Sequence, residues 1–172
     1  MKQDIILVNE KDEQTGRDEK LKVHQEGKLH RAFSVFIFNS KGEWLLQKRA
    51  KSKYHSPGLW SNACCSHPHP GKNILQEAKK RLKEEMGILC ALKEIFSFSY
   101  RIEFDSLIEN EIDHVFTGKF NGVVKPNKKE ADGWKWVSNK ALKSDVKENP
   151  QNYTYWFKIV LDKVLKYWFG RS

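Results

Sequence analysis

The sequence is poor in cysteine and has no long hydrophobic run. Its three cysteines are odd in number and two are adjacent, which excludes a secreted disulfide framework. The longest apolar stretch, Ala32–Phe38, falls far short of the ~18 residues that a membrane span needs. The N-terminus lacks the apolar core of a secretory signal. We therefore expect a cytoplasmic protein that does not associate with membranes.

Low-complexity tracts and fixed-period repeats are also missing, which excludes solenoids and propellers. The 172 residues fit one domain of the usual ~100–200 residues. No linker divides the chain, so a single domain over residues 1–172 is predicted. Hydrophobic residues make up 39% of the chain and aromatic residues 12%, which excludes a disordered protein.

Positive charge is in excess, because 31 Lys and Arg residues outnumber 22 Asp and Glu residues for a net charge of +9. Such a balance favours an anionic partner: nucleic acid, a membrane surface or a phosphorylated small molecule. The basic residues lie in short scattered clusters and form no long tail. A small anionic substrate is therefore favoured, and a non-enzymatic RNA-binding domain is the alternative from another class. No oligomerisation seam is visible, so we expect a monomer.

Alternating hydrophobicity and turn signals predict about seven strands. These are Ile5–Asn9, Arg31–Asn39, Glu43–Lys48, Leu59–Cys65, Glu94–Phe104, Glu109–Phe120 and Trp134–Val137. In the second of them Phe33, Val35 and Ile37 face one way, while Phe36 and Phe38 face the other. This pattern is typical of a strand that is buried on both faces.

Two helices are predicted. Asn73–Gly87 carries an N-cap residue at its start, a glycine at its end and an apolar stripe between them. Tyr153–Phe169 has apolar residues at steps of four, whereas Glu10–Gly27 reads as polar and turn-rich. Two helices and about seven strands in mixed order predict an α+β domain, a mixed α/β/α sandwich.

Three acidic residues share one face of the strand Glu109–Phe120, because strand residues two apart point the same way. Glu109, Glu111 and Asp113 would repel one another there. A solvated face would tolerate them, but the strand continues into an apolar segment. A bound cation is the other way to resolve the repulsion.

Histidines and cysteines supply further candidate groups. His24, His30 and His67 lie where loops are expected to meet strands, and neutral imidazole is the commonest metal ligand. Three imidazoles with two carboxylates would suit Mn²⁺, Zn²⁺ or Fe²⁺, and Mg²⁺ less well. A lone histidine is more often structural. Strand alternation would bury one of Cys64 and Cys65 and point the other into a cleft, where a thiol can transfer protons or act as a nucleophile.

Four stretches of the sequence carry a family resemblance when taken together. They are HQEGKLHRAFS at 24–34, SPGLWSNACCSHP at 56–68, ENEIDHVF at 109–116 and YTYWF at 153–157. In this order they resemble type I isopentenyl-diphosphate isomerase, a branch of the Nudix superfamily. The resemblance implies a Nudix-like mixed sheet flanked by helices.

The segment LKEEMGI at 82–88 resembles the end of a Nudix box. Nudix hydrolases carry an Arg-Glu pair just before this tail, and that glutamate binds metal. This chain has Lys80 and Arg81 there. The broken box favours the isomerase over the alternative of a Nudix hydrolase that acts on a nucleoside diphosphate derivative.

The resemblance implies the isomerisation of isopentenyl diphosphate to dimethylallyl diphosphate in isoprenoid biosynthesis, by protonation and deprotonation across the allyl unit. Cys65 and Glu111 match the thiol and carboxylate that would lie on opposite faces of the five-carbon unit. Tyr100 matches a hydroxyl close to Glu111. Trp156 matches an aromatic ring whose π face stabilises a tertiary carbocation.

The resemblance also implies two metal ions and a cationic binding site. The ligands of one tightly bound divalent metal (Mn²⁺, Mg²⁺ or Zn²⁺) would be His24, His30, His67, Glu109 and Glu111. Glu85 matches a residue that helps to hold Mg²⁺ against the diphosphate. The basic positions around the diphosphate would be Lys20, Arg49, Lys53 and Arg81.

Overall fold

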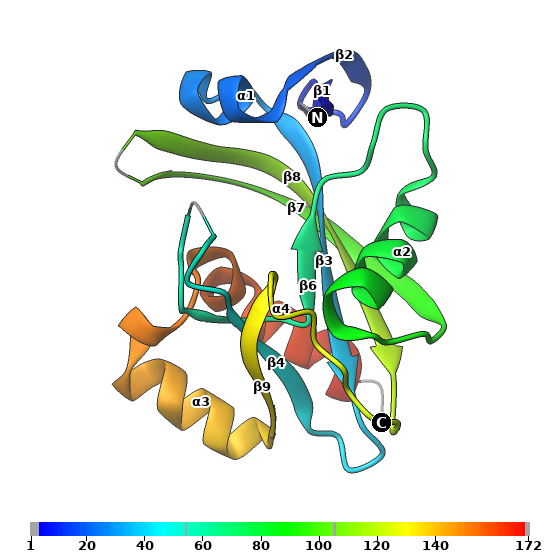
Figure 1. The fold of residues 1–172 in the computed structure, drawn as a ribbon, viewed down its shortest axis with the longest axis vertical. Helices are drawn as coiled ribbons and strands as arrows, with labels where there is room; N and C mark the ends of the chain where they lie inside the picture. Colours follow the sequence, from blue (N-terminus) through cyan, green and yellow to red (C-terminus); the bar gives the residue numbers. More distant parts are fainter. Residues whose placement is uncertain (1–3, 54, 105, 171–172) are drawn as a thin grey trace.

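A computed structural model describes residues 4–53, 55–104 and 106–170 of the chain. Within these ranges one mixed sheet of nine strands is flanked by helices (Figure 1). The strands are β1 (Asp4–Val8), β2 (Gln14–Glu19), β3 (His30–Phe38), β4 (Trp44–Arg49), β5 (Trp60–Ser61), β6 (Cys64–Ser66), β7 (Leu92–Phe104), β8 (Leu107–Lys119) and β9 (Ala131–Val137). The helices are α1 (Lys20–Glu26), α2 (Ile74–Met86), α3 (Asn139–Glu148), the 3₁₀ turn η1 (Pro150–Asn152) and α4 (Tyr155–Phe169). The predicted α+β class is confirmed.

Strand β3 lies at the centre of the sheet. It pairs in parallel with β8 along its whole length, and antiparallel with β6 on its other side. The register places His30 beside Glu111 and Ser34 beside Cys65. Three segments that are distant in the sequence therefore meet over a few residues of one strand.

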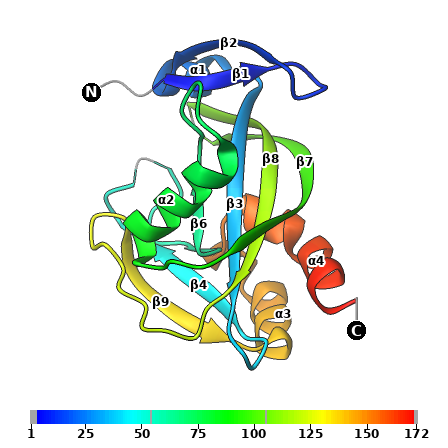
Figure 2. The same cartoon turned by 90° about the vertical axis from the view of Figure 1, so that its right-hand side faces the viewer.

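The two faces of β3 belong to two separate cores, as the alternation of its side chains predicts. Phe33 and Val35 pack with residues of α2, whereas Phe36 and Phe38 pack with residues of α4. Figure 2 shows α2 and α4 on opposite sides of β3. Because both faces are covered, the strand buries every residue except Arg31.

The sequence prediction missed β2, α1, α3 and the 3₁₀ turn η1. The segment Glu10–Gly27, read as polar turns, contains the whole of β2 and of α1. Strand β2 buries no residue, and α1 is seven residues long without a side-chain N-cap bond, so neither leaves a periodic pattern. Helix α3 buries only Leu142. The predicted strand Leu59–Cys65 is interrupted at residues 62–63 and forms β5 and β6.

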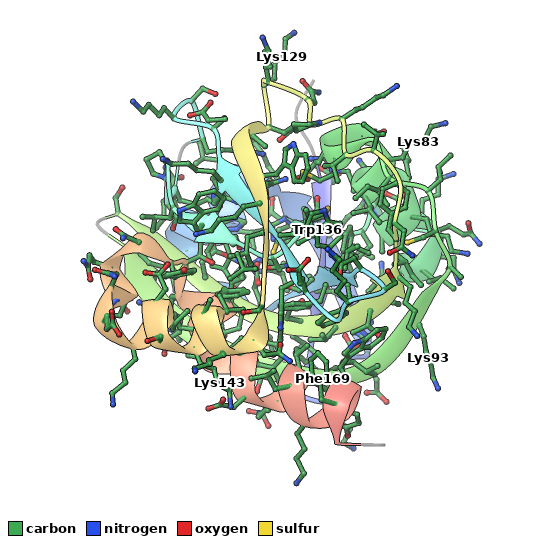
Figure 3. All side chains as sticks on the ribbon, turned by 90° about the horizontal axis from the view of Figure 1, so that it is seen from below. Lys83, Lys93, Lys129, Trp136, Lys143 and Phe169 are labelled. Atoms are coloured by element: carbon green, nitrogen blue, oxygen red, sulfur yellow. The ribbon has the colours of Figure 1, made fainter. Side chains whose placement is uncertain are left out.

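Basic side chains lie widely over the surface. Lys83, Lys93, Lys129 and Lys143 are exposed, and they point outward in different directions (Figure 3). This spread agrees with the short scattered clusters seen in the sequence. Among the described residues, no helix combines the length and the apolar composition that crossing a membrane requires.

Helix α2 ends at Gly87 in a left-handed conformation (φ 68°). A Cβ atom there would lie 2.8 Å from the backbone oxygen of Lys125. We expect Gly87→Ala to cost about 2–3 kcal/mol of unfolding free energy, because it adds a clash with the backbone to the left-handed penalty of roughly 1–2 kcal/mol. Urea unfolding measures this loss.

Gly71→Ala is the matched control for this substitution. Gly71 has φ 74° and no atom within 4 Å of its added Cβ, so only the left-handed penalty of roughly 1–2 kcal/mol applies. Equal losses in the two variants would show that the contact with Lys125 has no energetic weight.

Candidate functional site

A pocket of about 550 Å³, counted to its open mouth, lies beside the first half of β3. Ten of the residues predicted for the site line it: Lys20, Arg49, Lys53, Cys65, His67, Arg81, Tyr100, Glu109, Glu111 and Trp156. The pocket therefore gathers the acid–base, cationic and aromatic candidates of the sequence in one place.

The five side chains predicted to bind one metal lie together at this pocket. His24, His30, His67, Glu109 and Glu111 each offer one ligand atom, and these atoms lie within 4.8 Å of one another. All five residues are buried. They come from α1, from β3, from the segment after β6 and from β8, so only the folded chain forms the group.

The hydrogen bonds of two histidines show that this group fits a cation. Nδ1 of His24 lies 2.6 Å from the backbone oxygen of Lys20, and Nδ1 of His30 lies 2.8 Å from that of Lys28. A carbonyl oxygen only accepts, so each Nδ1 carries a proton and donates it there. Each Nε2 lies 3.3 Å from a glutamate oxygen, on the side of the cluster. With neutral rings, a divalent cation would find an electron pair on each Nε2 and on each carboxylate there.

Glu85 lies outside this group. Its side chain is 2% exposed, and its Oε1 is 2.7 Å from Nη2 of Arg81. Its Oε2 accepts a hydrogen bond of 3.1 Å from Gln47. Glu85 therefore contacts Arg81, a cation that is predicted to bind the diphosphate. The role of Glu85 toward Mg²⁺ stays a prediction.

The Cys65 sulfur is surrounded by polar side-chain groups from three residues. Trp156 Nε1 donates to it at 3.1 Å, and the thiol donates to Oδ1 of Asn62 at 3.0 Å. Ser34 Oγ is 3.5 Å away. Burial raises the pKa of Cys65 to about 12, so the thiol keeps its proton at neutral pH. Cys64, in contrast, is fully buried in the core under α2, as the alternation of the strand predicts.

The Glu111 carboxylate receives hydrogen bonds on both oxygens. Tyr100, its register partner on β7, donates to Oε2 at 2.7 Å, and His67 Nε2 lies 2.9 Å from Oε1. Although burial raises the pKa of Glu111, the contacts with His30, Glu109 and Tyr100 lower it to about 2. Burial, assisted by Glu111, raises the pKa of Tyr100 well above its usual value. The pair is therefore a phenol hydrogen-bonded to a carboxylate.

Asp113, the third acidic residue on this face of β8, is not among the five residues of the cluster. It is 1% exposed and accepts a hydrogen bond of 2.7 Å from Ser34 Oγ. Burial, and then the charge of Glu111, raise the pKa of Asp113 well above its usual value. The raised pKa favours the neutral acid, which would relieve part of the repulsion that the sequence predicts.

The pocket also contains residues that the sequence did not single out. His55 lines it, with its ring centre 5.6 Å from that of Trp156. Asn62 is fixed by donating to the backbone oxygens of Val35 and Cys64, which leaves its oxygen facing the Cys65 thiol. Ser34 was the one polar residue inside the predicted strand Arg31–Asn39, a signal that could have drawn attention to it.

Four basic residues give the pocket a positive wall. Lys20 belongs to α1, Arg49 to β4 and Arg81 to α2, whereas Lys53 lies in the loop after β4. Arg49 is 6% exposed and donates to the backbone oxygens of His55 and Ser56. Cations gathered at one pocket attract an anionic ligand.

Comparison with known proteins places this geometry in a family. The NUDIX domain family matches residues 28–157 of the chain. Isopentenyl-diphosphate Delta-isomerase 1 of Aromatoleum aromaticum is 49% identical over 166 residues, covering 96% of this chain and 94% of that protein. Isopentenyl-diphosphate Delta-isomerase of Pectobacterium atrosepticum is 44% identical, with 96% and 93% covered.

Two solved structures share the fold. A crystal structure of a Deinococcus radiodurans protein superposes with a TM-score of 0.73 at 18% identity, covering 86% of this chain and 90% of that chain. The MutT protein from Methanosarcina mazei gives a TM-score of 0.64 at 20% identity, covering 78% and 91%. At such identities the likeness concerns the fold alone.

Proposed function

The chain belongs to the isopentenyl-diphosphate Delta-isomerase family of NUDIX-domain proteins, and we propose that its pocket converts isopentenyl diphosphate to dimethylallyl diphosphate with Cys65 and Glu111 as the proton-transfer pair. The observation that carries this proposal is the presence of both groups in one pocket with four cations. Relatives that are 44–49% identical over 96% of the chain support the reaction.

The reaction moves one double bond by adding a proton and removing another. A proton joins the terminal CH₂ carbon of the substrate, and the positive charge develops on the tertiary carbon beside it. Loss of a proton from the CH₂ group between the tertiary carbon and the carbon that bears the diphosphate then forms the new double bond. Cys65 and Glu111 supply one acid and one base for these two steps, and both need a hydrogen-bonded position close to the carbon that they serve.

Two aromatic residues complete the reacting end of the pocket. The Trp156 ring lines the pocket and is 3% exposed, and the Arg49 guanidinium lies 5.3 Å from the centre of this ring. The role proposed for its π face is to stabilise the developing cation in a desolvated place, where such an interaction is worth about 2 kcal/mol. Tyr100 holds Glu111 Oε2 by its hydroxyl at 2.7 Å. Together the rings exclude water that would trap the cation.

The positive wall is proposed to bind the diphosphate. Lys20, Arg49, Lys53 and Arg81 line the pocket, and Glu85 lies against Arg81 where it can help to hold Mg²⁺. Binding at this remote group fixes the position of the reacting carbons, since the two ends belong to one small molecule.

The buried histidine–glutamate cluster is proposed to hold Mn²⁺, Zn²⁺ or Mg²⁺. Its three imidazoles favour Mn²⁺ or Zn²⁺ over Mg²⁺. A metal bound there supplies a Lewis acid that fixes the Glu111 carboxylate. We propose that one chain supplies every residue of the site, and that the chain acts as a monomer stays a prediction.

Proton NMR in deuterated buffer tests the reaction directly. Purified protein loaded with Mn²⁺ or Zn²⁺ is mixed with isopentenyl diphosphate and Mg²⁺. We expect dimethylallyl signals to grow and deuterium to enter the new methyl group, because the added proton comes from an exchangeable side chain.

An unchanged spectrum with both metals would overturn the isomerase proposal. Phosphate release from nucleoside diphosphate derivatives would instead favour the hydrolase. The present pocket gives that alternative no support, because Arg81 is paired with Glu85 at 2.7 Å in the broken Nudix box. The RNA-binding alternative leaves the buried cluster without a role.

A further inference from the structure

Glu130 joins two of the cations that are proposed to bind the diphosphate. Its Oε2 accepts a hydrogen bond from Nζ of Lys53, and its Oε1 lies 3.3 Å from Nη2 of Arg81. Lys53 comes from the loop after β4, and Arg81 comes from α2. One carboxylate thus connects two elements that approach the pocket from different sides.

The backbone around Glu130 holds this carboxylate in place. Its N–H donates to the oxygen of Asn127 at 2.8 Å, and its oxygen accepts from Ala50 at 3.0 Å. Lys53 N–H in turn donates to the oxygen of Ala50 at 3.1 Å. Both the main chain and the side chain of Glu130 therefore tie the Lys53 loop to the segment before β9.

The placement of Glu130 indicates that it holds the two cations in position and does not compete with the diphosphate for them. Lys53 and Arg81 line the pocket, whereas Glu130 is not among the described residues that line it. Its side chain is 21% exposed, so it approaches the two cations from outside the pocket. Burial alone would raise the pKa of Glu130, but contact with Lys53 and Arg81 lowers this pKa overall. The carboxylate is therefore charged at neutral pH.

We propose that Glu130 is a positioning residue that orients Lys53 and Arg81 for the diphosphate before the substrate binds. Both side chains are long and flexible, and ordering them during binding would weaken affinity. A carboxylate that already orders them removes this cost from the binding step. The inference rests on the proposed function, because it assigns the two cations to the diphosphate.

The test compares Glu130→Gln with Glu84→Gln. Each removes one negative charge that contacts Arg81, since Glu84 lies 2.9 Å from Nη1 of the same guanidinium. Only Glu130 also holds Lys53. We expect Glu130→Gln to raise KM for isopentenyl diphosphate about tenfold while kcat changes less than about twofold. Glu84→Gln should leave both constants nearly unchanged. Glu130→Asp, which keeps the charge on a shorter side chain, should fall between the wild type and Glu130→Gln.

Calorimetric titration with inorganic pyrophosphate measures the same effect without turnover. The dissociation constant should rise about tenfold in Glu130→Gln and stay within about twofold in Glu84→Gln. An unchanged or lower value in Glu130→Gln would overturn the proposal, because a competing carboxylate gives that result. A fall in kcat without a change in KM would overturn it too. If the wild type binds pyrophosphate but does not isomerise, the proposed function fails while the role of Glu130 is still tested.

Discussion

Replacing Cys65 by serine is expected to lower kcat by about 10³-fold, within the ~10²–10⁴-fold that a positioned acid or base contributes. The serine hydroxyl can keep the contacts with Asn62 and Trp156, which lie 3.0 Å and 3.1 Å from the sulfur. Its proton is far less acidic than that of a thiol, so the proton-transfer step slows while the fold remains. The NMR assay measures turnover, and thermal unfolding checks the fold.

Cys64→Ser is the matched control, because it makes the same chemical change one residue away. Cys64 is fully buried in the core beneath α2, and its side chain is not among the described residues that line the pocket. We expect kcat to stay within about twofold, with a stability loss of about 1–3 kcal/mol from a buried hydroxyl. Equal losses of kcat in both variants would show that the thiol of Cys65 has no special role.

The fold was predictable wherever one residue pattern decides the structure. Apolar residues on both faces of the segment Arg31–Asn39 predict a strand that is covered on both sides, and this strand proves to be the centre of the sheet. Asn73 and Gly87 mark the ends of α2 by their own chemistry. Helix α1 was not predictable, because tertiary contacts with β8 stabilise it and only Val23 and His24 are buried.

The site was predictable in its residue types but not in its supporting contacts. The shared face of Glu109 and Glu111 follows from strand geometry alone. The pairing of β3 with β8 brings His30 to Glu111, and no local pattern encodes that register. Glu130 shows the same limit, because its role depends on two cations that are distant in the sequence.

Glu109→Gln is expected to weaken metal binding by about 100-fold or more, since changing even a partner of a ligand costs about 10–100-fold. The substitution preserves side-chain volume in a residue that is 3% exposed, so packing survives while one negative ligand is lost. Metal content after dialysis, measured by mass spectrometry, reports the loss. Because Cys65 and Glu111 are untouched, excess Mn²⁺ should restore turnover in this variant.

Asp113→Asn gives the contrast that makes the Glu109 result specific. Asp113 lies on the same strand face and is equally buried, but it contacts Ser34 and is not among the described residues of the cluster. The amide keeps the volume of the side chain and can still accept the hydrogen bond from Ser34, so the metal content should equal that of the wild type. Loss of metal in both variants would mean that general repulsion on this face controls binding. Retention of metal in both variants would remove Glu109 from the ligand set, and the four remaining side chains would have to hold the ion.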